Sequence, residues 1–180
     1  MDQKTWEWQR TIDAETFIIS TARELLPHAF VREAFATEAM FWAHPVSDET
    51  LRAMLDNSCT LGLYKVDKDE QKTPIGMARM VTDYTTLAYL TDVYLQDAYR
   101  NLGLGKWIIH CCREVVLEMK DLRFMVLLTG SEKAQKLYRR ELGMSLLDGR
   151  EQALTCMGAR RTRLADAAAS AHDGPGAAEA

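Results

Sequence analysis

The sequence lacks the features that mark several classes of protein. No apolar run in its 180 residues approaches the roughly 20 residues that cross a bilayer. The amino terminus, Met1-Asp2-Gln3-Lys4-Thr5-Trp6, does not follow the charged-then-apolar pattern of a secretory signal. Basic residues are not in excess, because 22 Lys and Arg face 26 Asp and Glu, which leaves a net charge of -4. We therefore expect a cytoplasmic protein with neither a membrane nor a nucleic acid as its partner.

Cysteine is also scarce and is not arranged as a ligand set. The four cysteines are Cys59, Cys111, Cys112 and Cys156, and no Cys-x-x-Cys pair occurs. Zinc sites usually need paired ligands at short, fixed spacing, so the sequence predicts no metal. We expect free thiols that are buried like small hydrophobic side chains.

Apolar residues make up 47% of the chain, enough for one hydrophobic core in a single domain. The composition changes at the carboxyl end, where residues 165–180 read ADAAASAHDGPGAAEA and offer almost no large apolar side chain. Such a stretch cannot bury enough surface to order itself. We therefore expect a folded domain over residues 1–160 and a disordered Ala/Gly-rich tail over residues 161–180.

Apolar periodicity and turn residues predict the order of helices and strands. Helices are expected over residues 21–43, broken near Pro27, and over 48–55, 105–119 and 132–142. Strands are expected over residues 17–21, 59–66, 74–82, 87–95 and 124–129, followed by a hairpin of 144–147 with 152–157. This order predicts a mixed α/β single domain.

The segment over residues 93–106 places two glycines, Gly103 and Gly105, between a strand and the first turn of a helix. Several amides at a helix start have no partner within the helix, and the helix dipole favours an anion there. Glycine lets the backbone approach a ligand closely. The segment therefore predicts a phosphate or pyrophosphate site, with a plain helix start as the alternative.

Two common nucleotide motifs do not fit this segment. A Walker loop needs Gly where Arg100 stands and Ser or Thr where Trp107 stands. The dinucleotide fingerprint needs a third Gly, and Ile108 occupies that place.

The pattern Arg100-x-x-Gly103-x-Gly105 after an apolar strand resembles the acetyl-CoA pyrophosphate loop of the GNAT acetyltransferase superfamily. Residues 74–79 resemble the third strand of that family, and residues 134–138 with 142–144 resemble its final helix and turn. The resemblance covers about residues 15–150. It implies a GNAT-like α/β (α+β) fold, with a mixed, mostly antiparallel sheet of about seven strands flanked by about four helices.

The resemblance also implies which residues hold acetyl-CoA, the cosubstrate. The pantetheine arm of family members pairs like an extra strand with the strand before the loop, which an exposed strand edge suits. The positions that match this contact are Val93, Tyr94 and Leu95. Those that match the phosphate contact are Arg100, Asn101, Leu102, Gly103, Leu104, Gly105 and Lys106.

Two residues are the candidates for catalysis by acetyl transfer. Tyr138 matches the position that donates a proton to the leaving thiolate, although Gly143 follows it by five residues where the family commonly has four. A backbone amide near Val93 is the implied donor to the oxyanion. Asp92 is the candidate for accepting the proton of the amine, and the alternative is that it pairs with Arg79 on a neighbouring strand.

The acceptor side is less specific in the sequence. Trp42, His44, Arg79, Asp83 and Tyr84 are the candidates for binding the acceptor. Ordinary alternatives are a core aromatic for Trp42 and Tyr84, an exposed helix end for His44 and a turn for Asp83.

The function that these residues predict is transfer of the acetyl group of acetyl-CoA to a primary amine by direct attack in a ternary complex. The acceptor is an amine on a small molecule or a peptide, and the acidic net charge favours a cationic one. The resemblance also allows a homodimer. The alternative is a sensor or structural module that binds acyl-CoA without catalysis.

Overall fold

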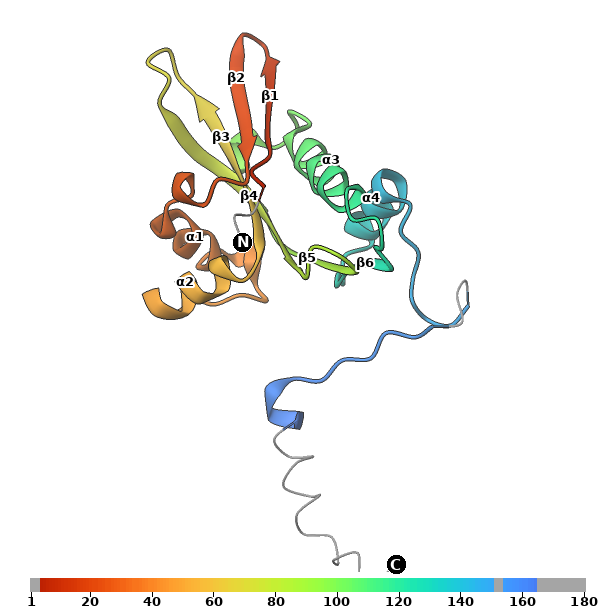
Figure 1. Cartoon of the computed structure of the whole chain (residues 1–180). Helices are drawn as coiled ribbons and strands as arrows, with labels where there is room; N and C mark the ends of the chain where they lie inside the picture. Colours follow the sequence, from red (N-terminus) through yellow and green to blue (C-terminus); the bar gives the residue numbers. More distant parts are fainter. Residues whose placement is uncertain (1–3, 151–153, 165–180) are drawn as a thin grey trace, which may run out of the picture. The chain divides into compact units, whose positions relative to one another are not determined.

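Residues 4–150 and 154–164 are described by the computed structural model of this chain (Figure 1). The chain divides into two units, Met1–Gly143 and Met144–Ala180. Residues 165–180 of the predicted tail lie outside the described part. The domain boundary at residue 160 and the disorder of the tail stay predictions.

The first unit is built on one mixed sheet of six strands in the order β1-β2-β3-β4-β5-β6. The first five strands pair in antiparallel fashion, and β6 lies parallel to β5. The predicted mixed, mostly antiparallel sheet is confirmed, with six strands where about seven were expected. The strands are β1 Glu7–Ile12, β2 Glu15–Ser20, β3 Cys59–Val66, β4 Lys72–Thr82, β5 Leu87–Leu95 and β6 Phe124–Leu127.

Four α-helices and three short 3-10 helices surround this sheet, which agrees with the predicted four helices. The α-helices are α1 His28–Phe35, α2 Asp48–Asp56, α3 Leu104–Leu117 and α4 Glu132–Leu142. The 3-10 helices are η1 Arg23–Leu25, η2 Glu38–Met40 and η3 Asp97–Tyr99. Figure 1 shows α1 and α2 on one side of the sheet and α3 and α4 on the other.

The amino-terminal half departs from the sequence prediction in two places. The helix expected over residues 21–43 is broken at Pro27, as predicted, because Pro27 lacks an amide hydrogen and holds an extended conformation at the start of α1. A second break, which was not predicted, lies at Thr37, whose extended backbone separates α1 from η2. Strand β1 was not predicted at all. It pairs with β2 through a turn at Asp13 and Ala14, both with positive φ. Hairpin turns of this kind favour Asn or Asp followed by Gly, and Ala14 stands where Gly is expected.

The two faces of the sheet bury different clusters of apolar side chains. The larger cluster joins alternate residues of β2, β3, β4 and β5 to α3, whose apolar stripe includes Ile108, Cys112 and Val116. The smaller cluster joins α1 and α2 to Met77 of β4 and Tyr94 of β5. Of the cysteines, Cys59, Cys111 and Cys112 are buried as expected, whereas Cys156 is exposed.

The second unit contains a single isolated bridge in its described part, between Asp148 and Thr155. Flanking hydrogen bonds join Gly149 to Leu154 and Cys156 to Leu147. Residues 151–153 of the predicted hairpin lie outside the described residues. Among the described strands, none of the six comes from this unit, which accounts for the smaller strand number.

Candidate active site at the end of β5

The loop that precedes α3 has an unusual backbone. Asn101 has a φ of 73° and Gly103 has a φ of 75°, and Gly103 is the residue that precedes the first turn of the helix. Glycine adopts this left-handed conformation without the steric penalty that a Cβ would impose. The loop therefore turns sharply from η3 into the start of α3.

The amides of this loop have no partner among the residues that the structure describes. Trp107 is the first residue of α3 whose amide donates to the preceding turn, to the carbonyl of Gly103 at 3.1 Å. Among the described residues, no hydrogen bond uses the amide groups of residues 101–106 as donors. An atom added at the Cβ position of Gly105 meets nothing within 4 Å. The loop thus presents a run of unpaired donors beside open space, at the positive end of a helix dipole.

The strand that leads into this loop has an open edge. Strand β6 pairs with β5 only from Leu87 to Leu90. In the described part of the chain, β5 beyond Leu90 has β4 on one side and no strand on the other. Val93, Tyr94 and Leu95 lie in this segment and are half-buried. An unpaired edge of this kind can accept an extended, amide-containing ligand.

A buried ion pair lies beside that edge. The guanidinium of Arg79 on β4 contacts Oδ2 of Asp92 through Nε and through Nη2, both at 2.7 Å. The indole Nε1 of Trp42, which follows η2, donates to Oδ1 of Asp92 at 3.1 Å. The structure therefore brings three of the predicted residues together, and it shows the pairing of Asp92 with Arg79 that was the alternative to a proton-accepting role.

The two basic side chains of the loop are held by carboxylates. Arg100 pairs with Asp97 at 2.8 Å, three residues before it. Lys106 on α3 pairs with Glu141 on α4 at 3.2 Å. Both cations are about half exposed, so a ligand can still reach them.

Glu141 is a contact point between α3 and α4 that the sequence did not reveal. Its carboxylate accepts hydrogen bonds from Arg140 and His110 in addition to Lys106, and these contacts lower the pKa of Glu141 to about 2. Its carbonyl accepts from Arg113 at 2.9 Å. No sequence spacing links α3 to α4, so the sequence does not predict these contacts.

Tyr138 lies on α4, one turn before Glu141. Its ring packs against the larger core cluster, and burial raises the pKa of its phenol above the ordinary value. No hydrogen bond between described residues uses its hydroxyl group. Gly143, in a left-handed conformation with a φ of 67°, ends the helix five residues later.

The remaining predicted residues lie elsewhere. The carboxylate of Asp83 accepts the amides of Thr85, Thr86 and Leu87, and these bonds together with the Thr86 hydroxyl hold the pKa of Asp83 well below its usual range. Asp83 therefore stabilises the turn between β4 and β5, which was the alternative to a role in binding the acceptor. His44 is exposed.

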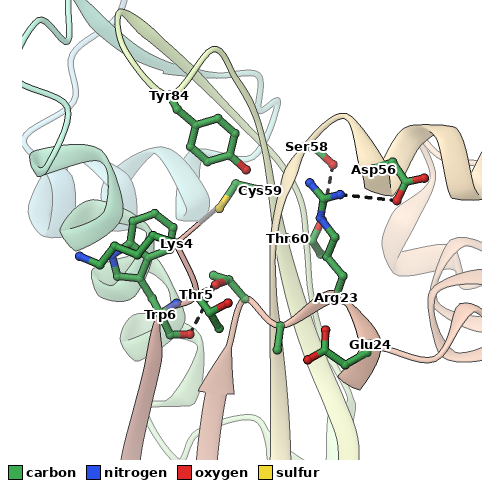
Figure 2. A pocket seen from close by; sticks show the side chains of 12 residues that line it. Lys4, Thr5, Trp6, Arg23, Glu24, Asp56, Ser58, Cys59, Thr60 and Tyr84 are labelled. Carbon is green, nitrogen blue, oxygen red and sulfur yellow. Dashed lines mark hydrogen bonds and ion pairs between the residues drawn. The ribbon is translucent and has the colours of Figure 1, made fainter. Parts of the chain in front are cut away.

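Tyr84 belongs to a pocket at the other end of the sheet from the loop before α3. The pocket has a volume of about 450 Å³ and is lined by Trp6, Arg23, Asp56 and Cys59 among others. Figure 2 shows Arg23 directed at Asp56, and their charged atoms lie 3.6 Å apart. Of the predicted site residues, the pocket contains Tyr84 alone. The structure thus separates Tyr84 from the cluster of Trp42, Arg79 and Asp92.

The part of the chain that the structure describes contains neither a membrane-spanning helix nor a cluster of metal ligands. Within residues 4–150 and 154–164, no helix is long and apolar enough to cross a bilayer. Nowhere in the same ranges do three or more His, Cys, Asp or Glu side chains gather in a way that could hold a metal ion.

Comparisons with known proteins agree with this geometry. A family model described as acetyltransferase (GNAT) family matches residues 23–144, which include the open edge of β5, the loop and α4. A predicted acetyltransferase of Gibberella zeae, FG08082, is 28% identical over 141 residues, which cover 71% of this chain and 78% of that protein.

Solved structures show the same fold. A GNAT-family protein from Xanthomonas campestris pv. campestris superposes with a TM-score of 0.64 at 24% identity and covers 80% of this chain and 92% of its own. A protein from Deinococcus radiodurans R1, described as an acetyltransferase, has a TM-score of 0.52 at 22% identity and covers 91% and 95%. Since the family model matches more than half of the chain, the protein belongs to the GNAT family of acetyltransferases.

Proposed function

We propose that this acetyltransferase moves the acetyl group of acetyl-CoA to a primary amine of a small molecule or a peptide, within a domain of residues 1–160. The observation that carries the proposal is the run of unused amide donors over residues 101–106, next to the open edge of β5. These donors suit the diphosphate of CoA. The half-exposed cations of Arg100 and Lys106 lie in the same segment and add positive charge.

The pantetheine arm would run along the open edge of β5. Val93, Tyr94 and Leu95 offer backbone groups on the side that β6 leaves uncovered. The two amides of the arm can pair there as a strand would. This arrangement places the thioester near the point where β5 and β6 part, beside Asp92.

Transfer then needs a neutral amine, a donor for the oxyanion and a proton for the leaving sulfur. The amine nitrogen forms a bond to the thioester carbonyl carbon, and a backbone amide near Val93 donates to the oxygen that becomes negative. The C–S bond breaks, the sulfur takes the proton of the Tyr138 hydroxyl, and the nitrogen of the amine releases its extra proton to solvent. Solvent restores the Tyr138 proton. The hydroxyl of Tyr138 suits this part because no described residue binds it.

The acceptor is proposed to be cationic in its resting form. The chain carries a net charge of -4, which favours approach of an ammonium group over that of an acid. Trp42 lies on the side of β5 that bears Asp92, so an acceptor that reaches the thioester from that side meets its indole. We place Trp42 and Arg79 on the acceptor side for this reason.

The experiment that tests the proposal follows release of free thiol from acetyl-CoA with a panel of amines. The panel contains aliphatic amines, diamines, amino-acid amides and a lysine peptide, and each has a quaternary ammonium analogue that cannot be acetylated. We expect thiol release with at least one amine, none with its analogue, and a product that carries one added acetyl group. Tight binding of acetyl-CoA without thiol release from any amine would favour a sensor instead.

Tyr138→Phe tests the proton donor in the same assay. We expect kcat to fall by a factor of about 10² to 10⁴, the usual contribution of a positioned acid, with unchanged affinity for acetyl-CoA. Tyr64→Phe is the matched control, since Tyr64 is fully buried on β3 and its hydroxyl has no partner among the described residues. An unchanged kcat in Tyr138→Phe would remove Tyr138 from the mechanism.

A further inference from the structure

Strand β5 is irregular at Asp92, where the proposed thioester site begins. The pairing of β4 with β5 shifts register between Met77 and Arg79, and Asp92 has a φ of 49°. Glycine, Asn and Asp adopt this conformation more readily than other residues, and a β-bulge is one of the places where it occurs.

The bulge decides which side chains of β5 face which side of the sheet. Leu90 and Val93 both contact the larger cluster on the α3 side, although strict alternation would put residues three apart on opposite faces. Tyr94 contacts Phe30 on the α1 side, with ring centroids 6.0 Å apart. Without the extra residue, Val93 and Tyr94 would exchange faces. The backbone that the thioester is proposed to meet therefore depends on this bulge.

The side chain of Asp92 holds the bulge from the α1 side. The residue is 5% exposed. Its Oδ2 accepts Nε and Nη2 of Arg79, and its Oδ1 accepts Nε1 of Trp42 at 3.1 Å and Oγ1 of Thr91 at 3.2 Å. A carboxylate offers about four acceptor positions, and these four bonds use them.

We propose that Asp92 is a positioning residue and that it does not take the proton of the amine. Its carboxylate binds β4 through Arg79 and the η2 segment through Trp42, and so fixes the bulge that aims the Val93–Leu95 edge at the thioester. With every acceptor position occupied, the carboxylate has none for the amine. The proton of the amine then passes to solvent.

The inference rests on the proposed function through the place of the thioester, and affinity for acetyl-CoA tests it without turnover. Asn tolerates the left-handed conformation, so Asp92→Asn keeps the backbone but leaves Arg79 buried without its counter-ion. We expect affinity for acetyl-CoA, measured by calorimetry, to fall about tenfold or more in this variant. A residue that acts only as a base would leave that affinity unchanged.

Rescue separates the two roles further. The double variant Arg79→Gln with Asp92→Asn replaces the ion pair by a neutral amide pair, which can still join β4 to β5. We expect the double variant to bind acetyl-CoA within about threefold of the parent, because a polar pair with both partners present avoids the unpaired buried charge. Loss of a base alone would not make the affinity for acetyl-CoA depend on Arg79.

The control is Glu15→Gln. Glu15 on β2 pairs with Lys65 on β3, so this variant removes one charge of another cross-strand ion pair. We expect no change in acetyl-CoA affinity there. All variants are compared below their melting temperatures. If Asp92→Asn does not fold, the affinity of the double variant is compared with that of the parent instead.

Three results would overturn the inference: unchanged affinity in Asp92→Asn, a double variant as impaired as the single one, or loss of the acidic limb of the kcat–pH profile in Asp92→Asn. If no amine is acetylated but the affinities follow the expected order, the proposed reaction fails while the positioning role of Asp92 stands. If the parent protein does not bind acetyl-CoA at all, both are refuted.

Discussion

A substitution at Gly105 separates ligand binding from folding more cleanly than one at Gly103. Gly103 has a φ of 75°, so any side chain there strains the free protein. Gly105 is the second residue of α3, has no positive φ, and leaves its Cβ position open within 4 Å. We therefore expect Gly105→Glu to fold normally and to lose acetyl-CoA binding, and Gly105→Ala is its uncharged partner.

The size of the effect follows from charge and distance. A carboxylate about 6 Å from each of two diphosphate charges raises the free energy of binding by about 1.4 kcal/mol in a water-like medium. At an effective dielectric constant of about 20 the penalty is about 5.5 kcal/mol. Affinity therefore falls at least about tenfold. Folding gains instead, since replacing Gly in a helix stabilises by up to about 1 kcal/mol and a carboxylate in the first turn adds about 0.3–1 kcal/mol.

Calorimetry with acetyl-CoA and thermal unfolding without it measure the two effects separately. We expect Gly105→Ala to melt at the parent temperature or up to about 4 °C above it, and Gly105→Glu up to about 8 °C above it. Only Gly105→Glu should show the full loss of affinity. A Gly105→Glu protein that binds acetyl-CoA as tightly as the parent would refute the loop as the diphosphate site.

Three further predictions concern single features of the first unit. Gly76→Ala should lower the melting temperature and weaken acetyl-CoA binding, because the new Cβ would lie 2.8 Å from the carbonyl oxygen of Tyr94 and push β5 away from β4. An unchanged melting temperature and affinity would contradict this. Tyr64→Phe should be neutral or stabilise by about 1 kcal/mol in urea unfolding, since its buried hydroxyl has no partner among the described residues, and a clear loss would contradict it. In the folded protein the pKa of Glu141 is lowered from 4.5 to about 2. The ionised carboxylate therefore stabilises the fold above about pH 4.5, and this contribution is lost as the pH falls towards 2. Glu141→Gln should flatten the pH dependence of the free energy of unfolding in that range.

Local sequence signals were sufficient for most of the sheet and for the loop before α3. The strands over residues 59–66 and 87–95 follow apolar patterns that end in turn residues, and the structure confirms them at the expected bounds. The glycines at 103 and 105 identified the start of α3 because a left-handed residue and an open helix turn both favour glycine. The family was recognisable from the same loop.

Other features depend on contacts that a linear pattern does not carry. Strand β1 is mostly exposed, and its Trp8 is bound by Glu114 of α3, so its pairing arises from tertiary contacts. The cluster at Glu141 likewise requires α4 to pack on α3. For Asp92, the sequence left two roles open, and the bonds to Arg79 and Trp42 became visible only when the bulge and η2 were placed together.

In the proposed complex, the amide groups at residues 101–106 hold the diphosphate of acetyl-CoA. The most direct measurement is an amide nuclear magnetic resonance titration of the labelled protein with acetyl-CoA. We expect the largest shifts on residues 101–106, followed by Val93 and Leu95. Shifts confined to the residues around Tyr84 and Arg23, with the amides before α3 unmoved, would contradict it.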